Sequence, residues 1–232
     1  MSYTLRLLPC SKYDNEVMES WLEDLALQGL ILKNIVCGIA IFQKQEPQKL
    51  RYRLSIIPAE KWDVYEDVSG EDELIAICEA SGWKFICKRG LFGIFMTADE
   101  TLEELHTEPE LQYLDMKGYM DWRSIMEGSI PFWVTCLMFS NWYRWGIFSD
   151  FGITFAIAMA AIMIVCVVDV VYEVTGMLAL YRKLKANGIS HEKKEWRDSA
   201  IRHRALVIVV VLVYTIGLGY GISLAGEMFA AL

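Results

Sequence analysis

Two hydrophobic patterns divide this chain of 232 residues. Up to about residue 100, apolar positions occur in short segments, either alternating with polar residues or recurring at helical spacing. From about residue 130, apolar residues run almost without charge over stretches close to the roughly 20 residues that a membrane helix needs. The pattern therefore predicts a water-compatible region followed by a membrane region.

The first region contains six strand-like runs and two helical ones. Alternating or apolar runs bounded by Gly, Pro and Asn predict the strands, and apolar residues on one face predict the helices. In chain order the predicted elements are a strand at 4–8, a helix that starts at a capping box of Ser11 and Asp14 and ends at Gly29, strands at 31–36, 39–44 and 50–57, a helix at 71–80, and a final hairpin around Arg89-Gly90. The order β-α-β-β-β-α-β-β predicts an α+β domain over residues 1–100, with one antiparallel sheet and both helices on one face.

Basic residues fall on the polar positions of several of these strands. If each strand buries its apolar positions, the basic ones share the open face of the sheet. The residues concerned are Arg6, Arg51, Arg53, Lys84 and Lys88. This face is either an ordinary solvated surface or a partner-binding surface that docks an acidic segment or an anionic ligand.

Charge separates the two regions further. Residues 1–127 carry a net charge of −10 and residues 128–232 a net charge of +2. An acidic domain repels phosphates, so we expect no nucleic-acid partner. Acidic residues interrupt the first 30 positions, which predicts no signal peptide and a cytoplasmic first region. The six cysteines show no C-x-x-C pair, and we expect them to be reduced packing residues.

Several motifs in the first region resemble a known bacterial family. They are "WLEDLALQGLIL" (21–32), "FQKQEP" (42–47), "RYRL" (51–54), "SGWKF" (81–85) and "LEELHTEPELQ" (102–112). As a set they resemble domain of unknown function 2812, over about residues 1–112. The resemblance implies a cytoplasmic domain followed by a few membrane helices, and genomic company with PadR-like transcriptional repressors. It implies no assigned activity and no catalytic residues.

The second region predicts an all-α membrane domain over residues 129–232. Three apolar segments, at about 130–148, from 151, and at about 205–226, predict three transmembrane helices. A juxtamembrane helical connector is expected at 101–128. The segment 182–204 carries eight Lys and Arg against three acids, which predicts a cytoplasmic loop. We therefore expect a multi-pass protein of the cell membrane with its N-terminus inside, its C-terminus outside and membrane lipids as partners. The basic loop is either this topology signal or a specific anionic-lipid site.

Two groups within the apolar segments are candidates for function or assembly. Asp169 and Glu173 are four residues apart on one helix, either at the membrane boundary or buried as a proton or cation site. Gly217, Gly221 and Ala225 form a small-residue face that packs either within the chain or against another copy or protein.

No catalytic motif appears in the sequence. The three histidines are scattered, and there is no H-E-x-x-H, G-x-S-x-G or Walker loop. We therefore expect no enzymatic activity, no cofactor and no metal site. Two hypotheses remain: a membrane-tethered regulatory or protein-interaction module that binds a protein partner or forms a homo-oligomer, and a small transport-associated protein that uses Asp169 and Glu173.

Overall fold

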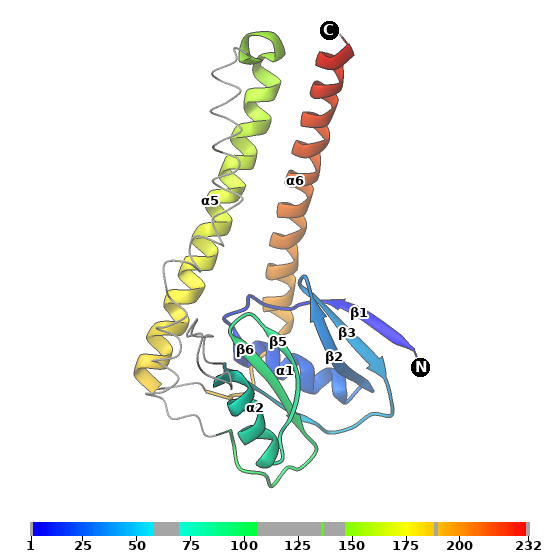
Figure 1. Ribbon diagram of the computed structural model, residues 1–232, viewed down its shortest axis with the longest axis vertical. Coiled ribbons are helices and arrows are strands. Elements are labelled where there is room, and N and C mark those ends of the chain that lie inside the picture. Colours follow the sequence, from blue (N-terminus) through cyan, green and yellow to red (C-terminus); the bar gives the residue numbers. More distant parts are fainter. Residues whose placement is uncertain (1, 58–69, 106–135, 137–146, 188–189, 231–232) are drawn as a thin grey trace. The chain divides into compact units, whose positions relative to one another are not determined.

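The computed structural model describes residues 2–57, 70–105, 136, 147–187 and 190–230. Its elements follow the predicted order in the first region (Figure 1). They are β1 (Tyr3–Leu7), α1 (Asn15–Ala26), β2 (Leu30–Val36), β3 (Ile39–Lys44), β4 (Arg51–Ile56), α2 (Gly70–Ala80), β5 (Lys84–Arg89), β6 (Phe92–Thr97), α5 (Ile147–Asn187) and α6 (Arg197–Ala230). The β-α-β-β-β-α-β-β prediction is confirmed.

The strands form two antiparallel sheets of three strands, so the expectation of a single sheet is wrong. The first sheet has the order β1-β3-β2, and the second has the order β4-β6-β5. A two-residue turn joins β2 to β3, and both of its residues, Cys37 and Gly38, have positive φ (48° and 78°). This is the backbone that a tight hairpin requires. The chain then leaves this sheet after β3, and β4 starts the second one.

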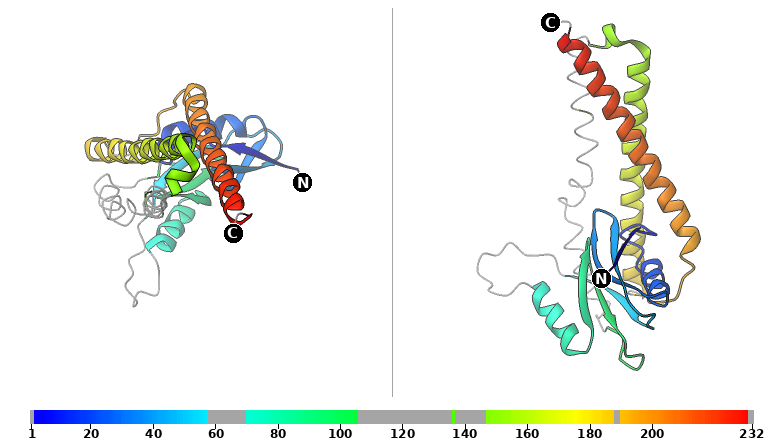
Figure 2. Two further views of the ribbon diagram at one scale, coloured as in Figure 1. Left: turned by 90° about the horizontal axis from the view of Figure 1, so that it is seen from above. Right: turned by 90° about the vertical axis from the view of Figure 1, so that its right-hand side faces the viewer.

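The two helices cover opposite faces of the second sheet, which corrects the expectation that both lie on one face. Successive residues of a strand point to opposite sides. In β6, Ile94 joins the core that includes α1, whereas Phe95 joins a smaller cluster with Cys78 of α2. Figure 2 shows α1 and α2 on either side of the strands. Each helix therefore has its own apolar contact with this sheet.

The larger core also takes in the end of α5. Met177, Leu180 and Leu184 are buried in it beside residues of α1 and of both sheets. The chain accordingly divides into two compact units, one of residues 1–121 with 176–204 and one of residues 122–175 with 205–232. The basic segment 182–204, expected as a loop of the membrane domain, is thus part of the first unit. Most of the expected connector at 101–128 lies outside the described residues.

One helical stretch in the described part of the chain is long and apolar enough to cross a membrane. It is Ala160–Ala186, with a mean hydropathy of 2.0. The apolar segment predicted to start at residue 151 lies in α5, which continues to Asn187. The expected first span at 130–148 lies almost entirely outside the described residues.

The outer strand β1 reverses the expected alternation. Tyr3, Leu5 and Leu7, expected in the core, are 59%, 64% and 42% exposed. The register explains this, because Thr4 pairs with Phe42 and Arg6 with Ala40, and Phe42 and Ala40 are the core residues of β3. Directly paired residues share a face of the sheet, so the apolar positions of β1 lie on the other face.

Candidate functional site

Helix α1 has one apolar side and one acidic side, and both are buried. The N-cap is Asp14 and not Ser11, the residue that the sequence predicted; Asp14 accepts a hydrogen bond from the Val17 amide at 3.4 Å. Val17, Trp21 and Leu22 face the core, as the sequence predicts. The other side carries Asn15, Glu16, Glu19, Ser20 and Asp24, of which the first four are at most 3% exposed. A charged side this well buried needs a partner for each polar group.

The partner is the segment 190–196, which connects α5 to α6. We call the five polar residues of α1 and this segment the latch. Glu16 accepts hydrogen bonds from Lys183, Lys194 and the Ser190 hydroxyl. Burial opposes ionisation of Glu16, but the two lysines outweigh it and hold the pKa of this carboxyl below its ordinary value. Glu16 therefore stays an anion inside the latch.

Further bonds fix the backbone of the segment. The Asn15 amide donates to the Ser190 carbonyl at 3.1 Å, and the Lys194 amide donates to the Ser20 hydroxyl at 2.9 Å. Asp24 accepts from the Trp196 indole at 2.8 Å and from Lys193 at 3.2 Å. Trp196 also packs against the domain core. The polar residues of α1 thus bind both the backbone and the side chains of segment 190–196.

Glu19 lies at the centre of the polar network. It accepts from the Leu54 amide at 2.7 Å, and His191 Nδ1 lies 3.0 Å from both of its oxygens. Burial raises the pKa of Glu19 above its ordinary value, although His191 and Arg53 act in the opposite direction. Glu23 accepts from the Tyr52 amide at 3.4 Å. These two carboxylates therefore occupy edge amides of β4, which would otherwise lack acceptors.

A second charged contact lies across β4 from this network. We call residues 99–105, which follow β6, the strap. Glu104 of the strap pairs with Arg53 at 2.6 and 2.9 Å and with Arg51 at 2.5 Å. Arg51 also donates to the Leu102 carbonyl at 2.8 Å. The hydrogen bond from Arg53 is the main reason that the pKa of Glu104 is lowered to about 2.

The five basic residues predicted to share an open face are not brought together. Arg6 lies in the first sheet and the other four in the second. A bulge between Phe85 and Cys87 reverses the alternation of side chains along β5. Lys84 pairs with Met96 and Lys88 pairs with Gly93, so the two lysines lie on opposite faces of the sheet. Arg51, Arg53 and Lys88 share one face, and Lys84 lies on the other. Arg53 is 8% exposed, and Lys88 pairs with Glu71.

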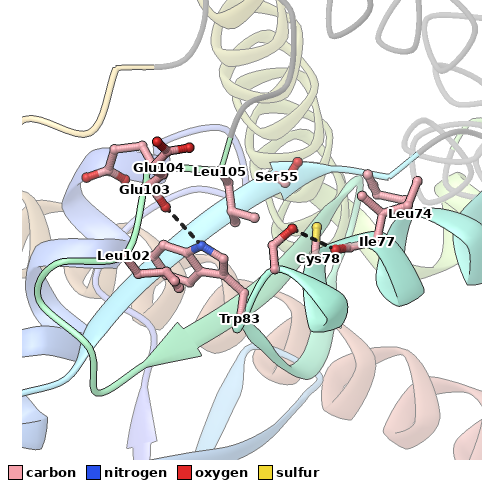
Figure 3. Close-up of a pocket in the computed structure, with 10 residues that line it drawn as sticks. Ser55, Leu74, Ile77, Cys78, Trp83, Leu102, Glu103, Glu104 and Leu105 are labelled. Carbon is pink, nitrogen blue, oxygen red and sulfur yellow. Dashed lines mark hydrogen bonds between the residues drawn. The ribbon is translucent and has the colours of Figure 1, made fainter.

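A cavity of about 430 Å³ lies between α2 and the strap (Figure 3). Its apolar lining residues are Leu74, Ile77, Cys78, Trp83, Leu102 and Leu105. The Trp83 indole donates to the Glu103 carbonyl at 3.2 Å, which ties the strap to the wall. Burial raises the pKa of Cys78 to about 11, so its thiol stays neutral and is a poor nucleophile.

The remaining predicted residues keep their status as predictions. Asp169 and Glu173 lie in α5 and Gly217, Gly221 and Ala225 in α6, but the surroundings of these five residues are outside what the structure describes. Within the described residues, no group of three His, Cys, Asp or Glu could hold a metal ion.

Sequence reasoning missed the latch, although both halves carry a signal. Glu16, Glu19 and Glu23 recur at helical spacing on one side of α1, and Lys183, Lys193 and Lys194 surround the connection between α5 and α6. The complementarity of these two sets was visible in the sequence, but their contact spans about 170 positions.

Comparison with known proteins agrees with the earlier resemblance. Residues 14–126 match the family described as protein of unknown function, DUF2812. The region 14–126 therefore belongs to this family. The DUF2812 match begins at the α1 N-cap and includes β4, α2 and the strap. No curated protein and no solved structure shows significant similarity to the chain.

Proposed function

We propose that this DUF2812 protein is a membrane-tethered regulatory module whose α+β domain binds a protein partner on the cytoplasmic side. The observation that carries the proposal is the latch. It joins the domain to the connection between α5 and α6 through Glu16, Glu19 and Asp24. A displacement of either helix pulls on α1, and α1 in turn contacts β4. The domain therefore senses the membrane segment mechanically.

The membrane anchor is the other part of the proposal. The apolar stretch Ala160–Ala186 is long enough to span, and its exposed side chains include Ile164, Val167 and Val171. From Met177 onward one side of α5 is buried in the domain core, at Met177, Leu180 and Leu184, so we place the membrane part of α5 between Ile147 and Thr175. We retain three spans with the N-terminus inside and the C-terminus outside as the topology to test. Single cysteines at positions 187 and 232 and an impermeant thiol reagent on intact cells provide that test.

Nothing in the described part of the chain favours the transport role of Asp169 and Glu173 over this module. Replacing both acids with Asn and Gln separates the two roles. A regulatory module keeps its partner after this change, whereas an ion pathway loses its activity.

The regulatory role is tested by opening the latch without unfolding the domain. Glu16→Gln with Asp24→Asn removes two anchoring charges, and hydrogen exchange of residues 190–196 reports whether the segment is released. Glu73→Gln with Glu79→Gln makes the same charge change on α2, where the acids are exposed. We expect affinity capture from mild detergent to show a partner set that changes with the first pair and not with the second. Identical capture from an open and a closed latch would contradict the proposal.

A further inference from the structure

We propose that the outer face of the first sheet meets the lipid surface of the membrane at the end that carries the β2–β3 hairpin tip. This inference depends on the membrane anchoring proposed above and adds a second, peripheral contact to it. We call the exposed apolar residues Tyr3, Leu5, Leu7, Val36 and Ile39 the lipid-facing patch. Its occupant is the interfacial layer of a bilayer, not a protein.

The patch is continuous because strand register places its residues side by side. Leu7 pairs with Ile39, and Ile39 pairs with Val36, so the three form one row across the sheet. Leu5 pairs with Ile41 in the adjacent accessible row. Val36 is 49% exposed and Ile39 is 36% exposed, comparable with the three residues of β1. Contiguous exposed apolar surface of this kind marks an interaction site.

Hydrogen bonds hold the patch next to the residue at which the apolar segment of α6 begins. Arg204 donates to the Leu7 carbonyl at 2.9 Å, and the uncharged segment of α6 begins in the sequence at the next residue, Ala205. The Leu8 amide donates to the Gly38 carbonyl at 3.2 Å, which holds the hairpin tip beside the same position. The patch is therefore tethered within a few residues of the point where α6 enters the proposed span.

A third link comes from α5. A Cβ atom at Gly176 would lie 2.8 Å from the Tyr13 ring, so this helix meets the segment between β1 and α1 at Gly176. Gly176 also follows the part of α5 that we assign to the membrane. Two independent helices thus leave the proposed bilayer next to residues 7–13.

The charges around the patch suit a lipid surface. Arg202 is exposed one turn before the apolar run, two residues before Arg204, which contacts the patch at the Leu7 carbonyl. Cations flanking apolar and aromatic side chains favour the headgroup level of a membrane, where the apolar groups enter the boundary and the cations meet lipid phosphates.

Fluorescence quenching by a headgroup nitroxide tests the proposal with the full chain. Cys37 at the hairpin tip is exposed and serves as one labelling site for bimane, in a chain whose other five cysteines are replaced by Ala. The control carries Cys37→Ser with Glu46→Cys, which moves the label to the other end of β3. The strand separates the two sites by roughly 20 Å. Both chains are reconstituted in vesicles of phosphatidylcholine and phosphatidylglycerol that contain a phosphatidylcholine with a nitroxide on its headgroup.

We expect quenching at position 37 to exceed quenching at position 46 at least threefold, and Leu5→Asn with Val36→Asn to remove most of the difference. Alkaline extraction reports integration, and the thermal midpoint of each labelled chain reports folding. Equal quenching of two integrated, folded chains would overturn this inference alone. Release of both chains by alkaline extraction would overturn the membrane anchoring, and the inference with it.

Discussion

The latch and the strap are both charged contacts, but they bury opposite signs. In the latch, the acids are buried and the bases exposed: the side chain of Glu16 is 3% exposed and that of Lys194 is 51% exposed. At the strap the bases are buried and the acid is exposed, since the side chain of Arg53 is 10% exposed and that of Glu104 is 44% exposed. The domain therefore has a fixed anionic site on α1 and a fixed cationic site on β4.

This difference determines which residue of each pair is costly to remove. A buried charge that loses its partner keeps the desolvation penalty without the compensating attraction. When an exposed charge is removed, its partner stays behind. Water can solvate that partner only if the partner itself lies near the surface. The effect of a substitution thus depends on the burial of what stays behind as well as on what is taken away.

The largest effect is expected at Arg53, which joins the two contacts. Arg53→Ala removes the pairs with Glu104 and Glu23, and it leaves the buried Glu19 without its neighbouring cation. We expect a loss of about 3–5 kcal/mol in the free energy of unfolding, typical of breaking a buried pair. Urea unfolding of the full chain in detergent, followed by hydrogen exchange of β4, measures it.

Lys84→Ala is the matched control, because Lys84 lies on the same sheet and is exposed. It should change stability by at most about 0.5 kcal/mol, as surface substitutions usually do. Equal losses for the two variants would show that Arg53 is not a structural centre. The burial of Arg53 also means that reversing its charge disturbs the fold, so Arg53→Glu is not a clean test of partner binding.

The sequence was sufficient for the order of elements and insufficient for their tertiary partners. Periodicity and turn residues such as Gly29 and Gly38 correctly predicted both helices and all six strands of the first region. The bulge in β5 placed Lys84 on the other face of the sheet, and periodicity does not predict a bulge. In β1, the alternation of apolar and polar residues predicted a strand, but it did not show which face the register would expose, and the register exposes Leu5. The core contribution of Met177 was hidden, because an apolar residue in a long apolar helix is equally typical of a membrane span.

The contact of α5 with the domain provides the second prediction. Gly176→Leu inserts a side chain where a Cβ atom alone would lie 2.8 Å from the Tyr13 ring. We expect a loss of about 1–3 kcal/mol from overpacking, with faster hydrogen exchange in residues 190–196 as the latch loosens. Ala179→Leu adds the same side chain at an exposed position three residues on, and it should leave exchange unchanged. A similar response to both substitutions would contradict a close approach at Gly176.

The third prediction concerns the strap and pH. The pKa of Glu104 falls from an ordinary value of 4.5 to about 2 in the folded chain, first because Arg53 donates hydrogen bonds to the carboxylate. A lowered pKa gives stability that is fully present above pH 4.5 and is lost as the pH falls towards 2. We expect hydrogen exchange in residues 99–105 to accelerate over this range. In Glu104→Gln the acceleration should already be present at neutral pH and should change little on acidification. A wild-type strap that stays protected at pH 2 would rule out Glu104 as its anchor.

The smallest effect is expected where both contacts have an exposed cation. Lys193 of the latch is 67% exposed and lies 3.2 Å from Asp24, and Lys49 beside the strap is 68% exposed and lies 2.7 Å from Glu100. If burial determines the contribution of each ion pair to stability, Lys193→Ala and Lys49→Ala should each lower the free energy of unfolding by less than about 1 kcal/mol. High salt screens exposed charges, so even this small loss should disappear there. Urea unfolding at low and high salt compares them directly. A markedly larger loss at Lys193 would mean that the latch is a cooperative network in which even its exposed cation is required, because Asp24 also positions Trp196 through the indole hydrogen bond.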